Sequence, residues 1–310
     1  QICREIYRGI MKEFVDYASG KLGISNKFLL EKDIILHRLL LKLSKTNFCQ
    51  DFIFKGGTCL IKCYYGYYRF SEDLDFTYSK QGDFTNKSQK EVRRILSKNI
   101  DQTAKILMEI SSELNLKFVA DKSDKKYIEF GGSNKFVTFK LWYNSELLDS
   151  EQFIKIQINF VEKLLYKEVK MPVLTLLKDI PAKEIAFLYP DYIDLLEIVK
   201  IPCYDIKEIL IEKARAILTR KVVKSRDFID IYIISMKENL DVKLFEEEIM
   251  EKTLFMLQYM KYVKNISNLD LEQFILDEEE KILLRPLDNK FKGYLKMIIP
   301  YLNAISEEIR

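Results

Sequence analysis

The spacing of apolar residues predicts helices at both ends of the chain and strands between them. Residues 4–19 and 26–45 repeat apolar positions every three to four residues, the spacing of an amphipathic helix, and Gly20 is the expected end of the first. The polar segment 86–116 fits one helix, with or without a break. From residue 205 onward the spacing is helical throughout, and it predicts helices over 205–221, 225–238, 242–264, 270–284 and 287–306.

Alternation of apolar and polar residues marks the expected strands. The apolar run 52–54 and residues 74–78 are the first two, with a short helix over 58–64 between them. Four more candidates follow the long helix, with a turn at Gly131 and Gly132, over 116–121, 126–130, 135–143 and 152–160. After them, four prolines interrupt a stretch expected to be irregular, at positions 172, 181, 190 and 202.

This order of elements predicts an α+β fold. We expect a mixed β-sheet core flanked by helices, followed by a helical C-terminal domain. The chain of 310 residues is about two domains long at roughly 150 residues each. The proline-rich stretch near residue 200 is the expected boundary, which gives a core over 1–200 and a helical domain over 201–310 that completes the active-site cleft.

Composition narrows the class of protein. Hydrophobic residues make up 48% and charged residues 31%, which predicts a folded protein with a real core, and the aromatic content of 13% excludes a disordered chain and a coiled coil. Lysine and arginine number 50 against 47 acidic residues, so binding through net charge alone is excluded, whereas a local basic cleft is allowed. The single histidine, His37, lies on a leucine-rich helix and is interpreted as structural.

The cysteines and the apolar runs bear on localisation. Five scattered cysteines indicate reduced thiols rather than a disulfide framework. Cys59 and Cys63 lie one helical turn apart without a neighbouring ligand in the sequence, which favours core packing over metal binding. No apolar run is long enough to span a membrane, and Arg4 and Lys12 interrupt any signal-like start. We therefore expect a soluble cytoplasmic protein.

The segment from Phe54 to Phe76 carries the expected chemistry. Glycine is scarce here, with 10 residues in the chain, yet Gly56 and Gly57 stand together directly after a strand, followed by Thr58. Backbone N–H groups of glycine can approach a ligand closely, and the start of a helix favours an anion. Asp73 and Asp75 lie further on at the start of a strand, where a period of two puts both carboxylates on one face.

A phosphate cradle facing two carboxylates describes a site for a nucleoside triphosphate with Mg²⁺, which binds proteins through one or two carboxylates and keeps phosphate oxygens as further ligands. Either half alone is more often structural, because Gly-Gly after a strand is usually a turn and Asp-x-Asp is common. Their combination within a strand–turn–helix–strand context favours the functional interpretation.

The combination resembles the nucleotidyltransferase superfamily with a DNA polymerase β-like core, and more specifically the AbiEii/AbiGii-type toxin family. The run from Arg69 to Asp75 is nearly the family's signature, and Glu31-Lys32-Asp33 opens a helix as it does there. Downstream, residues 212–216, Arg220 and residues 226–230 match its second block. The resemblance extends from about residue 28 to 235 in the correct order.

The resemblance implies roles for these residues. Gly56, Gly57 and Thr58 would hold triphosphate oxygens, and Asp73 and Asp75 would bind Mg²⁺. Ser71 would contact phosphate. The nucleotide-binding set would also include Arg69 and Lys213, with Lys213 neutralising triphosphate charge. Asp227 or Asp230 would complete the pocket.

A structural alternative for the second block is a buried ion-pair network that joins two helices, because Arg226 and Asp230 are four residues apart on one helix face. One departure concerns the third carboxylate that many relatives place on a later strand. The polar face of the strand over 153–160 carries Lys155, Gln157 and Asn159 and no acid.

The family implies a Mg²⁺-dependent transfer of NMP from an NTP to an acceptor hydroxyl. The acceptor would be an RNA, at a tRNA 3′ end. The protein would be the toxin of a toxin–antitoxin or abortive-infection system in phage defence, and its partner would be a cognate antitoxin. A small-molecule or protein hydroxyl as acceptor and a non-catalytic binding scaffold remain alternatives. A basic stretch beside the second block would hold RNA phosphates, at Arg215, Arg220, Lys221, Lys224 and Arg226.

Overall fold

The computed structural model describes residues 10–131, 134–272, 274 and 283–310. The chain divides into two compact units. Unit 1 comprises Gln1–Glu162 and Val169–Cys203, and unit 2 comprises Lys163–Glu168 and Tyr204–Arg310. None of the helices in the described part of the chain has the length and apolar character that a membrane crossing requires.

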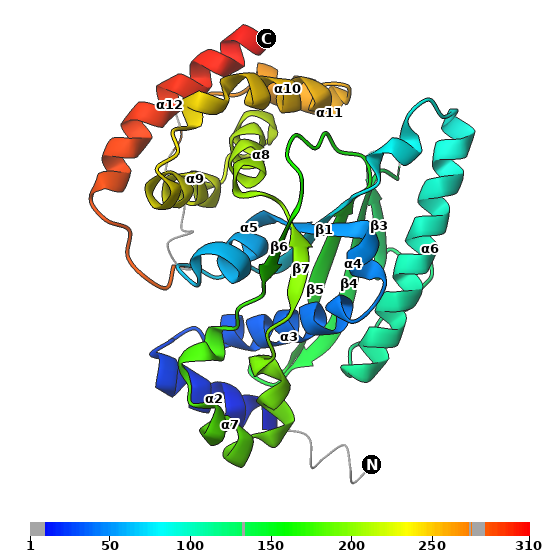
Figure 1. The fold of residues 1–310 in the computed structure, drawn as a ribbon, viewed down its shortest axis with the longest axis vertical. Helices are drawn as coiled ribbons and strands as arrows, with labels where there is room; N and C mark the ends of the chain where they lie inside the picture. The colour runs from blue at the N-terminus through cyan, green and yellow to red at the C-terminus, as the bar shows by residue number, and fades with distance from the viewer. Residues whose placement is uncertain (1–9, 132–133, 273, 275–282) are drawn as a thin grey trace. The chain divides into compact units, whose positions relative to one another are not determined.

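Unit 1 contains a mixed sheet of seven strands in the order β3-β4-β5-β2-β1-β7-β6 (Figure 1). The pairs β1–β7 and β2–β5 are parallel, and the other four are antiparallel. The strands are β1 Phe52–Lys55, β2 Asp73–Tyr78, β3 Ile128–Gly131, β4 Phe136–Ser145, β5 Ser150–Asn159, β6 Val169–Pro172 and β7 Lys200–Cys203. With the helices around it, this sheet confirms the expected α+β class.

The helices of unit 1 begin where the sequence supplies side-chain caps. Asn26 accepts a hydrogen bond from the Leu29 amide at the start of α3, and Ser88 forms a reciprocal capping box with Glu91 at the start of α6. The α-helices are α2 Ile10–Leu22, α3 Lys27–Ser44, α4 Phe48–Asp51, α5 Gly56–Cys59, α6 Gln89–Glu113 and α7 Ala182–Leu188.

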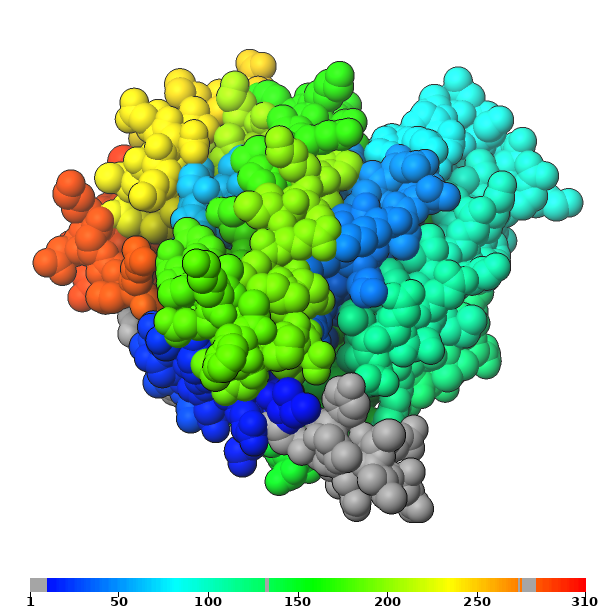
Figure 2. Space-filling view, turned by 60° about the horizontal axis from the view of Figure 1, so that its bottom comes forward, coloured from blue at the N-terminus to red at the C-terminus, as the bar shows by residue number. Residues whose placement is uncertain are grey.

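Shorter helical turns complete unit 1. A π-helix, η1 Leu60–Tyr65, continues α5 directly, and 3₁₀ turns occur at η2 Gln81–Phe84, η3 Leu176–Asp179 and η4 Pro190–Leu196. Figure 2 shows α2 beside the segment of α7 and η4 on one face. Stacking of Phe14 on Tyr192, with ring centroids 4.0 Å apart, holds them together.

The regular elements of unit 2 are all helices over its described residues, as expected. Its helices are α8 Ile206–Thr219, α9 Ser225–Glu238, the 3₁₀ turn η5 Val242–Phe245, α10 Glu246–Met256, α11 Met260–Ser267 and α12 Lys290–Ile309. The single helix expected over 242–264 is therefore wrong, because the chain leaves the α conformation between α10 and α11. Most of the helix expected over 270–284 lies outside the described residues.

Three details of unit 1 differ from the sequence prediction. The first helix passes Gly20 and ends at Leu22, because the left-handed conformation that stops it, φ +66°, falls on Gly23. Its expected first residues, 4–9, and the expected turn residue Gly132 lie outside the described residues. Residues 116–121 form no strand but a single bridge from Lys117 to Trp142, because β3 occupies the neighbouring edge of β4.

The third difference lies in the stretch expected to be irregular, which contributes the two short strands β6 and β7. Pro172 and Pro202 lie within them, opposite Lys200 and Lys170. A proline within so short a run predicts a break in the strand. Pro172 lies in the edge strand β6, which needs fewer backbone donors, whereas Pro202 lies in β7, between β6 and β1. The two strands extend the sheet beyond β1, with β7 parallel to β1.

A buried ionic cluster ties α3 to the π-helix. The Lys62 ammonium, 0% exposed, lies 2.8 Å from the Asp33 carboxylate, which also accepts a 2.8 Å hydrogen bond from the Tyr67 hydroxyl. Burial lowers the pKa of Lys62, and Asp33 opposes that shift. The Glu31 carboxylate, also on α3, accepts hydrogen bonds from Ser145 and from the Glu146 amide at 2.6 and 3.0 Å. These acids therefore anchor α3 to the unit.

We expect Asp33→Ala to lower the free energy of unfolding by about 3–5 kcal/mol, because it leaves the Lys62 charge buried without its carboxylate. Denaturant unfolding measures the loss. Asp33→Leu combined with Lys62→Met removes both charges and should regain most of it, since a buried pair replaced by apolar residues is often neutral. A double variant no more stable than Asp33→Ala would contradict the ionic explanation.

Candidate active site

The glycine turn lies between β1 and α5, and both glycines are in close contact with side chains of the site. Gly56 adopts φ +77°, and a Cβ there would lie 2.4 Å from Oδ2 of Asp75. A Cβ on Gly57 would lie 2.4 Å from Nη2 of Arg69 and 3.2 Å from Oγ of Ser71. The backbone of the turn is thus packed directly against three of the side chains that the sequence assigned to the site.

Asp73 and Asp75 stand at the start of β2 on one face of the sheet. Both are half-buried, whereas Leu74 and Phe76, which point to the other face, are buried in the core. Strand β2 lies between β1 and β5, so Asp75 has Lys55 as its cross-strand neighbour on one side and Gln157 on the other. The face predicted from the period of two is therefore present, with the turn beside it.

Ser71 and Thr58 connect the turn to β2. The Thr58 hydroxyl lies 2.8 Å from Oγ of Ser71 and 2.5 Å from the carbonyl oxygen of Asp73, to which it can donate its proton. Thr58 is 1% exposed. Its hydroxyl therefore fixes the segment before β2 against the start of α5, a structural task beside the phosphate contact that the resemblance implies.

Arg69 is the largest fully buried side chain of unit 1's site. It is 1% exposed, and its Nη1 donates a 2.8 Å hydrogen bond to the carbonyl oxygen of Phe70. The guanidinium carbon lies 5.8 Å from the ring centroid of Tyr68. With its Nη2 against Gly57, Arg69 places a permanent positive charge directly behind the glycine turn.

Gln157 stands where a third carboxylate would lie. Strand β5 pairs in parallel with β2, and Gln157 is opposite Asp75 while Lys155 is opposite Asp73. On its other side Gln157 faces Thr138 of β4, to whose hydroxyl its amide donates a long 3.4 Å hydrogen bond. The position next to the aspartate pair therefore carries a neutral amide.

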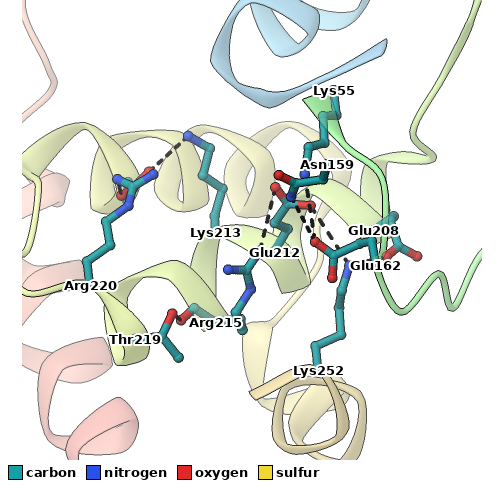
Figure 3. A network of polar contacts seen from close by, with 11 residues as sticks. Lys55, Asn159, Glu162, Glu208, Glu212, Lys213, Arg215, Thr219, Arg220 and Lys252 are labelled. Carbon is teal, nitrogen blue, oxygen red and sulfur yellow. Dashed lines mark hydrogen bonds and ion pairs between the residues drawn. The ribbon is translucent and has the colours of Figure 1, made fainter. Parts of the chain in front are cut away.

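Sequence reasoning missed a buried pair at the edge of this polar face. Lys55, the last residue of β1, has its ammonium 3.8 Å from Oε2 of Glu162, and the two side chains are 6% and 1% exposed. Asn159 donates a 3.2 Å hydrogen bond to the same carboxylate. Figure 3 shows these three side chains pointing toward one another. The available signal was a lysine within an apolar strand directly before Gly56.

In unit 2, Lys213 of α8 forms ion pairs with both aspartates of α9. Its ammonium lies 2.9 Å from Asp227 and 2.6 Å from Asp230, whose side chains are 0% exposed. Arg220 also pairs with Asp227. Burial alone would raise the pKa of Asp227, but Lys213 and Arg220 outweigh it and hold that pKa below its ordinary value. A buried network joining the two helices is therefore present.

The basic stretch of unit 2 is less exposed than expected. Arg215 is buried, pairs with Glu212 at 3.7 Å, and does not lie on the surface as an RNA contact would. Figure 3 shows Lys213 and Arg215 of α8, and Arg220 directly after that helix. Lys221 is exposed, and Arg220, Lys224 and Arg226 are half-buried.

His37 is 1% exposed, more buried than expected, and burial together with Lys62 lowers its pKa well below the usual value. It is therefore neutral, as a structural histidine would be. The Tyr67 hydroxyl donates a hydrogen bond to Asp33, so this tyrosine takes part in the packing of the loop.

Comparison with known proteins places the chain in a family. A search of curated proteins finds no match. Among solved structures, the crystal structure of JHP933 from Helicobacter pylori is 17% identical, covers 91% of this chain and 91% of that one, and gives a TM-score of 0.42. The crystal structure of a candidate nucleotidyltransferase from H. pylori is 17% identical, with 93% and 99% covered and a TM-score of 0.42.

The family's sequence model, described as "Nucleotidyl transferase AbiEii toxin, Type IV TA system", matches residues 38–307. The match includes the glycine turn, the aspartate pair and the Lys213 block, so it confirms the resemblance inferred from these motifs. The chain belongs to the AbiEii nucleotidyltransferase toxin family.

Proposed function

We propose that the chain transfers a nucleoside monophosphate from an NTP to the terminal hydroxyl of an RNA, with Mg²⁺, as a cytoplasmic toxin. The observation that supports it is the contact between Gly56 and Asp75, with Asp73 on the same face of β2. A turn that excludes a Cβ next to two carboxylates fits a triphosphate with its divalent cation. The acceptor hydroxyl would attack the α-phosphorus, and pyrophosphate would leave.

In this proposal Asp73 and Asp75 would hold the cation, and the chemistry that it would supply is neutralisation of phosphate charge. The backbone of Gly56 and Gly57 lies beside them, and the guanidinium of Arg69 behind Gly57 adds positive potential where triphosphate charge would collect. Ser71 is placed to contact a phosphate oxygen while it is held by Thr58. Catalysis would consist of positioning and charge neutralisation.

Because Gln157 is neutral, the question arises which group removes the proton of the acceptor hydroxyl. An amide cannot remove that proton at neutral pH, so the strand beside Asp75 supplies orientation rather than a base. The proposed reaction then depends on the aspartate pair and on deprotonation by another group or by water. We expect slow turnover, which suits a toxin that modifies a limited RNA pool.

Lys213 is part of the family's second block, and in this proposal it neutralises the negative charge of the triphosphate. Its ion pairs with Asp227 and Asp230 give it a structural role as well. Triphosphate binding and ion pairing predict different NTP affinities for a variant in which both Lys213 and one of its aspartates are changed.

Asp73→Asn and Asp75→Asn should each reduce NMP transfer by at least about 1000-fold, since a neutral amide holds a divalent cation poorly. Labelled NTP incubated with total tRNA and Mg²⁺ gives the readout. The matched control is Asp149→Asn, an exposed aspartate of unit 1 with φ +47°, a conformation that asparagine also adopts. Transfer at the wild-type rate in both site variants would refute the site.

Lys213→Met should lower the free energy of unfolding by about 3–5 kcal/mol, because two buried aspartates lose their shared cation. Adding Asp230→Asn should restore part of that stability. NTP affinity, measured by calorimetry, should stay low in the double variant if Lys213 contacts triphosphate. Recovery of affinity together with stability would assign Lys213 to structure alone.

RNA binding should weaken steeply with salt, with a slope of about −0.7 per phosphate contacted in a single strand. Lys221→Ser with Lys224→Ser should make the slope shallower by up to about 1.4, whereas Lys237→Ser, an exposed lysine of the same unit, should leave it unchanged. Filter binding over a salt series measures the slopes.

Expression in a bacterial host distinguishes the alternatives. The wild type should slow growth and Asp73→Asn should not. Salt-insensitive RNA binding with equal growth of both strains would favour a small-molecule acceptor, and toxicity retained by Asp73→Asn would favour a binding scaffold.

A further inference from the structure

Three cysteines meet in the core of unit 1, outside the site described above. Cys59 ends α5, Cys63 lies in the π-helix η1, and Cys203 ends β7. Their exposed fractions are 0%, 3% and 0%. The sulfur of Cys203 lies 3.5 Å from that of Cys63, and the three sulfur atoms all lie within 4.8 Å of one another.

The fold, and not the sequence spacing, brings the third thiol in. Cys59 and Cys63 share one side of the helix that follows the glycine turn, as expected from their separation of one turn. Cys203 comes from a strand that the sequence did not reveal, β7, whose parallel pairing with β1 puts it opposite Phe54. Cys59 and Cys63 are buried in the core, as expected, and Cys203 adds a third sulfur that the spacing did not indicate.

The chemistry of the cluster suits a bound cation. Its three sulfur atoms converge from α5, η1 and β7, all within 4.8 Å of one another. Cysteine binds a metal as its thiolate.

We propose that Cys59, Cys63 and Cys203 bind one soft monovalent cation of the Cu(I) class in trigonal coordination. Metal–sulfur bonds of about 2.3 Å at 120° put the sulfurs roughly 4 Å apart, which falls within the observed range of 3.5 to 4.8 Å. Thiolates select soft cations. A structural Zn²⁺ site takes four ligands, whereas the described residues group three here.

Coordination changes no oxidation state. Each thiol that binds gives its proton to solvent, so uptake becomes weaker at low pH. A disulfide is the competing fate of these thiols, and it requires the sulfurs to approach to about 2.05 Å and a two-electron oxidant. The observed separation of 3.5 Å is closer to the coordinated geometry.

The test uses the full chain with Cys3→Ser and Cys49→Ser, which leaves only the three cluster thiols. Under anaerobic, reducing conditions the protein competes for Cu(I) with a chromophoric chelator. We expect one Cu(I) per chain, three sulfur neighbours in X-ray absorption, and much weaker binding of Zn²⁺. Cys203→Ser in this background should lower Cu(I) affinity by more than the roughly 100-fold typical of outer-shell changes.

A thermal readout guards against a variant that merely unfolds. Saturating Cu(I) should raise the Tm of the background protein by roughly 5 °C, and should not raise that of Cys203→Ser or Cys63→Ser. Failure to withdraw copper from the chelator would overturn the proposal. Equal affinity in the serine variants, or an intact mass showing that the thiols form a disulfide under these conditions, would overturn it as well.

Discussion

The candidate site of unit 1 depends on one steric constraint, the absence of a side chain at Gly56. The carboxylate of Asp75 occupies the space that a Cβ would fill, at 2.4 Å. Only glycine combines φ +77° with that contact, so β1 can end, turn and start a helix while β2 stays hydrogen-bonded beside it. A larger residue would move the aspartate or separate the strands, and either change would dissolve the site.

The sheet extends this constraint into a row of polar groups. Lys55, Asp75, Gln157 and Thr138 are successive cross-strand neighbours on β1, β2, β5 and β4. Because register fixes such neighbours, a slip of one residue in any pairing would exchange the row for core side chains such as Phe76 and Ile156. Burial of the apolar face of the sheet allows only one strand register, and that register also fixes the positions of the side chains on the polar face.

Features of the fold and of the site that depend on neighbouring residues in the sequence could be predicted, whereas features that depend on contacts between distant residues could not. Helix α9, Ser225–Glu238, coincides with its prediction because its apolar spacing is local. The Asp73–Asp75 face followed from the period of two. Glu162 next to Lys55 could not be predicted, because a chain reversal after β5 brings it there. Strand β7 was hidden by Pro202, and with it the approach of Cys203 to Cys63.

The division of the chain has a consequence for dissecting the protein. Glu208 is 0% exposed, and its carboxylate accepts hydrogen bonds from the Leu165 and Tyr166 amides at 2.9 and 2.8 Å and pairs with Lys252 (Figure 3). Both amides come from Lys163–Glu168, the short piece that unit 2 takes from the middle of unit 1's sequence. A fragment beginning at Tyr204 would bury that carboxylate without two of its donors. Unit 2 is thus built from two separate segments of the sequence. A truncation at Tyr204 removes the first segment, and with it two hydrogen bonds to a buried carboxylate.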